Sequence, residues 1–237
     1  MSKRAATGND IREKRSGAGV NDRADFSAMA HRALLTELDR ALAPDAIDRL
    51  ARYVDLVVTW NKKLDLTAAR GARAQVEVLL ADSLVLADTS IIPRDAQLID
   101  VGSGAGAPAL PLLLVRPDLQ AMLIEPLRKR VAFLRTAIGS LSLAERARVL
   151  EHKLDPARAT LPDSARPPDV AISRATFAPE IWLPAALALA PRAIVMLASQ
   201  PTPAADGGRL VRELDYVLPF SRAPRRVAIF ERTTRSA

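Results

Sequence analysis

The sequence predicts an α/β fold in which helices precede a doubly wound, mostly parallel sheet. Beyond Pro93, short apolar runs alternate with longer segments of helical spacing, which is the pattern of such a sheet. Hydrophobic residues make up 49% of the 237-residue chain but aromatic residues only 4%, so the core must consist mainly of Ala, Leu, Val and Ile. That composition suits helices packed on a buried parallel sheet. A glycine-rich segment also follows the first predicted strand.

The chain before Pro93 divides into two parts. Residues 1–26 are rich in Gly, Ala, Ser, Asn and charge without any period, and we expect a flexible basic tail. Residues 27–92 form a predicted helical extension, because apolar residues follow helical spacing over 34–42, 47–58 and 76–85. Pro44 suits the start of the second of these helices.

Residues 93–237 form the predicted sheet domain. We expect buried strands at 98–101, 122–124, 149–150, 170–172 and 194–197. Two further strands, at 216–217 and 227–230, are expected to close one edge, where antiparallel pairing is an option.

Composition excludes several classes of site. The chain has no cysteine, so a disulfide framework, a thiolate metal site and a cysteine nucleophile are all excluded. The only histidines are His31 and His152, too few for a histidine-rich metal centre, and we expect His31 at a solvated helix end. We therefore predict no metal.

Charge and hydropathy bear on location and partners. We find neither a charged segment followed by an apolar run at the start nor an apolar run of about eighteen residues, and expect a soluble, cytoplasmic protein without membrane contact. The formal net charge of +7 raises the odds of a polyanionic partner. A monomer is expected.

The glycine-rich segment is the strongest local signal. Residues 100–106 read DVGSGAG and lie between the first strand and the helical run 110–115, the context of a nucleotide site. Glycines there allow positive φ and turn amide N–H groups toward a ligand. The candidate cofactor residues in it are Asp100, Gly102, Ser103, Gly104 and Gly106. Because Ala107 completes G-x-G-x-x-A, a nicotinamide dinucleotide remains an alternative.

Carboxylates after the next strands extend this site. Glu125 ends the second strand and offers its oxygens to the ribose hydroxyls of either cofactor. Asp100, directly before the loop, favours S-adenosylmethionine, since its carboxylate could face the ligand's ammonium group. We place Leu154 and Asp155 beside an adenine, with Asp155 accepting from the exocyclic amine; a solvated loop carboxylate is the alternative.

Four further segments, taken with the loop, resemble one family. Residues 60–67 read WNKKLDLT, 82–84 DSL, 129–134 KRVAFL and 173–175 SRA, and they are similar in order to motifs of the RsmG (GidB) type of 16S ribosomal RNA guanine-N7 methyltransferases. The resemblance covers about residues 34–232. It implies a class I methyltransferase fold, S-adenosylmethionine as methyl donor, and 16S ribosomal RNA or the small subunit as partner.

The chain departs from the family's motifs at polar positions. Val78-Leu79 replaces a usual Arg-His pair, residues 197–200 (LASQ) lack a usual Lys-Gly pair, and Asp65 replaces an asparagine. The segment 107–111 reads APALP where members of the family usually have F-P-G-I-P. Because of these changes, an alternative remains: the chain is a diverged paralogue that binds RNA or ribosomes without reaction, or methylates another substrate.

Guanine N7 carries a lone pair and no proton, so its methylation needs no general base and depends on positioning. We expect Arg174, after the fourth strand, to be the catalytic, substrate-facing arginine near the cofactor; a salt bridge at a strand end is the alternative. The predicted RNA contacts are Lys62, Lys63, Arg128, Lys129 and Arg130. Basic residues at a helix start oppose the dipole and favour an anionic partner, although a solvated helix face would look the same.

Overall fold

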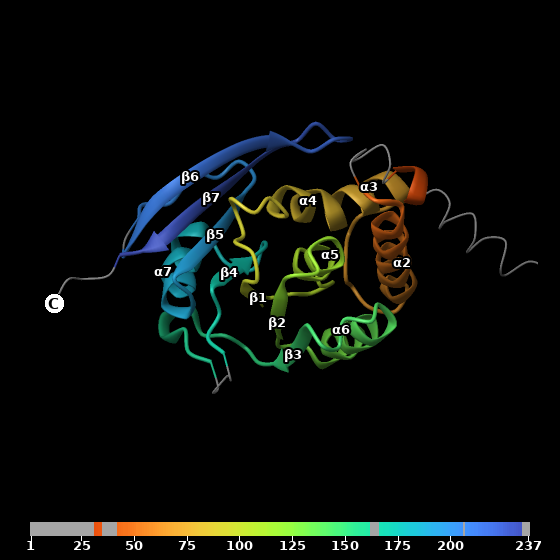
Figure 1. The fold of residues 1–237 in the computed structure, drawn as a ribbon, viewed down its shortest axis with the longest axis horizontal. Helices are drawn as coiled ribbons and strands as arrows, with labels where there is room; N and C mark the ends of the chain where they lie inside the picture. The colour runs from red at the N-terminus through yellow and green to blue at the C-terminus, as the bar shows by residue number, and fades with distance from the viewer. Residues whose placement is uncertain (1–30, 35–41, 162–165, 206, 234–237) are drawn as a thin grey trace, which may run out of the picture.

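The computed structural model describes residues 31–34, 42–161, 166–205 and 207–233. Its centre is a seven-stranded sheet in the order β3-β2-β1-β4-β5-β7-β6 (Figure 1). The strands are β1 (Gln97–Val101), β2 (Gln120–Glu125), β3 (Ala147–Glu151), β4 (Val170–Ser173), β5 (Arg192–Leu197), β6 (Gly208–Val217) and β7 (Pro224–Arg232). The first five pair in parallel, whereas β7 is antiparallel to both β5 and β6.

Helices cover both faces of the sheet. They are α2 (Pro44–Asn61), α3 (Ala72–Val76), the π-helical η1 (Glu77–Ala81), α4 (Asp82–Leu86), α5 (Ala109–Val115), α6 (Arg128–Ser140), the 3-10 helix η2 (Pro156–Arg158) and α7 (Pro179–Leu189). Side chains of α2, α5 and α6 share one core cluster, and those of α7 share the second. In Figure 1, α7 lies to one side of the sheet and α5 and α6 to the other.

Local sequence accounts for α2 and its packing. Pro44 occupies the first turn, where the missing N–H costs nothing, and Asp45 complements the positive end of the helix dipole. Leu50, Val54 and Val57 recur at helical spacing and are fully buried in the cluster that also contains the sheet. The helices before β1 therefore pack into the same core as one face of the sheet.

The order in which successive strands are added to the sheet reverses at β1. From β1 the chain proceeds to β2 and β3 on one side, and β4 then returns to pair with β1 on the other. The loops after β1 and β4 diverge at this switch point, which is where open parallel sheets bind ligands. The glycine-rich segment lies there.

Each predicted strand is confirmed, including an antiparallel closing pair that is longer than expected. The periodic stretch 76–85 is interrupted rather than continuous, because the π-helical turn η1 separates α3 from α4. The tail 1–26 and most of the predicted helix over 34–42 lie outside the described residues. The division at residue 93 stays a prediction.

The expectation for His31 is wrong. Its side chain is buried, and Nδ1 lies 2.8 Å from Asp55 Oδ1 on α2. The polar sequence before His31 favours solvation, whereas in the fold the helix α2 supplies the partner that burial of a polar group requires.

Within the described ranges, no helix is long and apolar enough to cross a membrane. The same part of the chain contains no group of three or more histidine, aspartate or glutamate side chains arranged to hold a metal ion.

Candidate active site

Three glycines shape the loop after β1, and they do so for different reasons. Gly102, Gly104 and Gly106 have φ of +75°, +53° and +87°, a region that other residues rarely adopt. A Cβ at Gly102 would lie 2.1 Å from Thr176 Oγ1, and one at Gly106 would lie 2.5 Å from Leu110 Cδ1. At Gly104 the nearest atom would be Gly102 O, at 3.8 Å. Space therefore remains open beside Gly104, where a ligand can approach the backbone.

Asp100 is a buried acid at the base of this loop. Its side chain is 1% exposed, and Oδ2 has no hydrogen-bond partner among the residues described. Burial raises the pKa of Asp100 to about 7, because the charged form loses its hydration. Ser103 Oγ donates to the main-chain oxygen of Asp100 over 2.8 Å and closes the turn. Asp100 Oδ2 is thus free to accept a hydrogen bond from a ligand.

Glu125 supports the loop from the end of β2. Its carboxylate is 2% exposed; Oε2 accepts from Gly104 N at 2.9 Å, and Oε1 accepts from Leu127 N at 3.0 Å. Each carboxylate oxygen has a further lone pair. Glu125 can therefore hold the loop and still accept a hydroxyl group.

The two residues placed beside an adenine have local roles. Asp155 is exposed, and its Oδ1 accepts from Ala157 N at 3.0 Å, which caps η2. Leu154 is buried in the cluster that also contains Ile124. The contact of these two residues with a cofactor stays a prediction.

Arg174 follows β4 and lies against the segment before β1. Its Nη1 donates to Val78 O at 2.5 Å and to Asp82 Oδ2 at 3.2 Å. Tyr216 on β6 donates its hydroxyl to the other oxygen, Asp82 Oδ1, at 2.6 Å. Arg174 thus makes the ion pair that we considered as its alternative role.

Asp82, Arg174 and Tyr216 border a cavity of about 350 Å³ at the carboxyl ends of β4 and β5. Its other lining residues are Glu77, Val78, Ala175, Phe177, Pro179, Met196, Leu197, Ala198, Gln200, Leu218 and Arg225. Phe177 stacks on buried Trp182, with ring centroids 6.1 Å apart. The cavity combines apolar walls with a few polar groups, as small-molecule and base pockets do.

The acid groups of this cavity are already engaged. Glu77 Oε1 accepts from the main-chain N–H groups of Phe220 and Ser221 at 2.6 and 2.8 Å. Burial works to raise the pKa of Glu77, but the bonds from Ser221 and Phe220 outweigh it and hold the pKa below its ordinary value. Glu77 is therefore an ionised anchor for the segment between β6 and β7.

The turn after β4 links the cavity to the glycine loop. Ser173 Oγ and Thr176 Oγ1 both donate to Val101 O, at 2.8 and 3.2 Å. Between them, Ala175 has a φ of +57°, which costs about 1 kcal/mol or more for a residue with a Cβ. This strained turn fixes Arg174 relative to the loop.

The predicted RNA contacts all lie at the surface. Arg130 Nη2 donates to Asp65 O at 2.8 Å, and Arg128 Nε lies 3.0 Å from Glu151 Oε1. Lys62, Lys63 and Lys129 are exposed, and none has a side-chain bond to a described residue. The hydrogen bond joins Arg130 to the segment that contains Asp65. RNA binding by these residues stays a prediction.

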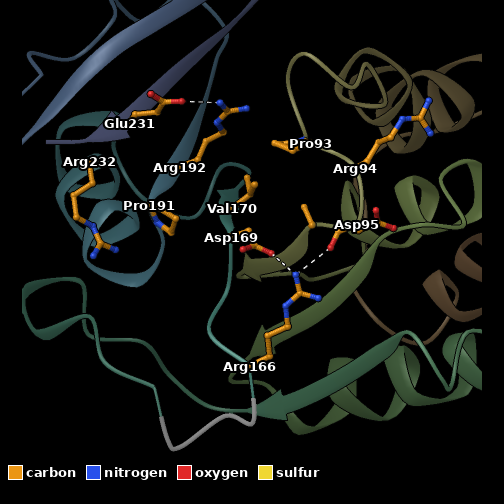
Figure 2. A pocket seen from close by; sticks show the side chains of 11 residues that line it. Pro93, Arg94, Asp95, Arg166, Asp169, Val170, Pro191, Arg192, Glu231 and Arg232 are labelled. Atoms are coloured by element: carbon orange, nitrogen blue, oxygen red, sulfur yellow. Dashed lines mark hydrogen bonds and ion pairs between the residues drawn. The ribbon is translucent and has the colours of Figure 1, made fainter. Parts of the chain in front are cut away.

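A second cavity, of about 490 Å³, lies at the amino ends of β4 and β5, at the opposite end of these strands from the first cavity (Figure 2). Arg166 there lies between Asp169 Oδ2, at 3.0 Å, and the main-chain oxygen of Asp95, at 3.2 Å. Arg192 pairs with Glu231 Oε1 at 2.7 Å. Two of the arginines that line this cavity are thus paired with acids.

Sequence reasoning did not single out Asp82 or Tyr216 as members of the first cavity. Asp82 appeared only within the DSL motif, and Tyr216 only within a predicted strand. The ring of Tyr53, on α2, was not singled out either; its hydroxyl donates to Ala105 O in the glycine loop at 2.9 Å. The motif was a usable signal for Asp82, whereas neither tyrosine carries a local one.

The strand order, the glycine loop after β1 and the acid at the end of β2 define a Rossmann-like class I methyltransferase fold. The family model described as "GidB: rRNA small subunit methyltransferase G" matches residues 46–189. The chain belongs to this GidB family.

Two curated relatives agree with that assignment. Ribosomal RNA small subunit methyltransferase G of an Anaeromyxobacter species is 34% identical over 204 residues, which cover 82% of this chain and 92% of the relative. The protein of the same name from Anaeromyxobacter dehalogenans is 34% identical over 220 residues, 87% of this chain and 100% of its own. Among solved structures, a SAM-dependent methyltransferase from Aquifex aeolicus aligns with 67% of this chain and 93% of its own, at 17% identity and a TM-score of 0.48.

Proposed function

We propose that this chain uses S-adenosylmethionine to methylate N7 of a guanine in 16S ribosomal RNA. The observation that carries the proposal is a loop that combines an open approach to the backbone at Gly104 with a buried Asp100 Oδ2 that has no partner among the described residues. An RNA acceptor follows from the name of the curated relatives, and the N7 position follows from the family resemblance. Such a reaction belongs in the cytoplasm, where ribosomes are found, and the expectation of a monomer is retained.

The residues at the loop fit the proposed cofactor. Gly104 leaves room for a ligand against the main chain, Asp100 offers a free acceptor to a donor such as an ammonium group, and Glu125 retains lone pairs for ribose hydroxyls. The residues that would hold it are Asp100, Gly102, Ser103, Gly104, Gly106, Glu125, Leu154 and Asp155. When bound, S-adenosylmethionine supplies an electrophilic methyl group on a sulfonium centre.

The acceptor side of the protein is suited to positioning rather than to proton transfer. Glu77 and Asp82 both accept hydrogen bonds from the protein, so neither is a free base in the cavity. That suits guanine N7, which has no proton to lose. Arg174 would donate to an oxygen of the RNA and hold the base in line, and such positioning can be worth roughly 7–11 kcal/mol.

The test is methylation of a defined substrate. Small subunits from a strain that lacks the gene would be incubated with the protein and S-adenosylmethionine, and the digested 16S RNA analysed by mass spectrometry. We expect one new 7-methylguanosine, absent when the methyl donor is omitted. No methylation by a protein that binds S-adenosylhomocysteine would overturn the proposed reaction.

One observation favours a second candidate, a diverged paralogue that binds RNA or ribosomes or methylates another acceptor. Val78, Leu197 and Gln200, at positions where the chain departs from the family's motifs, all line the cavity near Arg174. These three departures therefore fall on the acceptor side. Binding of S-adenosylhomocysteine together with modification of a different RNA would favour this candidate. A nicotinamide enzyme would instead be stabilised thermally by the dinucleotide.

A further inference from the structure

We propose that Asp82 and Tyr216 are positioning residues that fix Arg174 at the acceptor cavity. This inference rests on the proposed function and deepens it, because it concerns how the same cavity would present Arg174 to RNA. It draws on three segments that are distant in the sequence. Asp82 and Arg174 are separated by 92 positions, and Asp82 and Tyr216 by 134.

The carboxylate of Asp82 is the centre of the arrangement. Its residue is 8% exposed, and each oxygen accepts from a different donor: Oδ1 from the Tyr216 hydroxyl and Oδ2 from Arg174 Nη1. A buried carboxylate is costly unless it is paired and hydrogen-bonded, so the two donors and the acid hold one another in place.

Arg174 is held by only one of its nitrogens. Nη1 contacts Val78 O and Asp82, while Nε and Nη2 have no hydrogen bond to any residue in the described part of the chain. The Arg174 side chain is 23% exposed and borders the cavity. Nε and Nη2 form the edge of a guanidinium that binds two acceptor oxygens at once. The tether therefore leaves the useful edge free.

The gain from such a tether is entropic. A free arginine side chain loses rotamer freedom when a ligand fixes it. Here the Asp82 contact and the Val78 carbonyl remove much of that freedom beforehand. Tyr216 stays a donor at neutral pH, because burial and the nearby Asp82 charge raise its pKa.

The experiment is a kinetic cycle on the full chain with small subunits as substrate. Tyr216→Phe keeps the ring and removes only the hydroxyl, and we expect kcat to fall about tenfold, with the affinity for S-adenosylhomocysteine unchanged. Asp82→Asn should lower kcat further. A purely structural role would instead reduce the melting temperature and cofactor affinity together with the rate.

A double variant separates positioning from general damage. Once Arg174→Ala has removed the guanidinium, addition of Tyr216→Phe should cause no further loss of kcat. Wild-type kcat in Tyr216→Phe, or losses that multiply in the double variant, would overturn the inference.

A readout that does not need turnover keeps this test distinct from that of the function. We expect the Arg174 Nε–H resonance to be sharp in the wild-type protein and broadened in Tyr216→Phe. A wild-type protein that transfers no methyl group would refute the proposed function, whereas an identical Arg174 resonance in both proteins would refute the tether.

Discussion

The three loop glycines differ in what an added Cβ would contact. At Gly102 and Gly106 an added Cβ would meet protein atoms, but at Gly104 it would enter open space while φ is +53°. We expect Gly104→Ala to cost about 1–2 kcal/mol of stability and to raise the dissociation constant for S-adenosylhomocysteine at least about tenfold. Calorimetry measures the second effect.

Gly139→Ala is the matched control for that variant. Gly139 lies in α6, and a Cβ there would have no atom within 4 Å. We expect it to stabilise the helix by about 0.5–1 kcal/mol and to leave cofactor binding intact. Equal affinities in the two variants would contradict the assignment of Gly104.

The acid below the loop makes stability depend on pH. The pKa of Asp100 is raised by burial from 3.8 to about 7, so the folded protein binds more protons than the unfolded chain between these values. Its contribution to stability is therefore full below about pH 4 and is lost as the pH rises through 7. Asp100→Asn should remove this part of the pH dependence.

Urea unfolding at pH 5 and pH 8 measures it, without ligand. The difference between wild type and Asp100→Asn cancels other titrating groups, and the variant should gain relative stability at the higher pH. A wild-type protein that gains stability over the variant between pH 5 and pH 8 would show that Asp100 ionises readily in the fold.

At the scale of elements, α2 supports the glycine loop. The Tyr53 hydroxyl is buried and donates to Ala105 O, 52 positions along the chain. Tyr53→Phe would leave that carbonyl without its partner, so we expect a loss of about 1–3 kcal/mol in urea unfolding and weaker binding of S-adenosylhomocysteine. Thr59→Val, at an exposed position of the same helix, should change neither quantity. Wild-type behaviour of Tyr53→Phe would mean that the loop does not depend on α2.

The elements themselves were largely predictable, because their signals are local. β1 and β4 are apolar runs buried on both faces, and α2 has apolar residues at helical spacing after Pro44. The π-helical turn η1 was not predictable, since Glu77–Ala81 keeps the periodicity of an ordinary helix. The contacts of this turn also come from distant segments, since Glu77 accepts hydrogen bonds from Phe220 and Ser221.

At the scale of the whole molecule, the net charge of +7 should act through particular surfaces. Exposed Lys129 lies in the first turn of α6, shortly after the end of β2, whereas exposed Arg94 lines the cavity at the amino ends of β4 and β5. Reversal of either charge changes the net charge equally. We expect Lys129→Glu to weaken 16S RNA binding severalfold and to lower its salt dependence, and Arg94→Glu to have little effect. Filter binding over a salt series measures both; equal losses would point to nonspecific attraction.

Part of the site could be predicted from local sequence, and part depends on residues that are distant in the sequence. Asp100–Gly106 and Glu125 could be singled out because one loop and the next strand carry them. The grouping of Asp82, Arg174 and Tyr216 could not, because it depends on how β4, β6 and α4 meet in space. The prediction of a solvated His31 is wrong for the same reason, since its partner Asp55 lies on another helix.

The anchoring of Phe220 and Ser221 by Glu77 has a consequence for biosynthesis. Strands β6 and β7, residues 208 to 232, leave the ribosome after the loop and the helices have been made. Until then Glu77 lacks both of its amide donors and Asp82 lacks its phenol. A nascent chain can thus fold the glycine loop and the helices around it before Tyr216 and Leu218 complete the wall of the acceptor cavity.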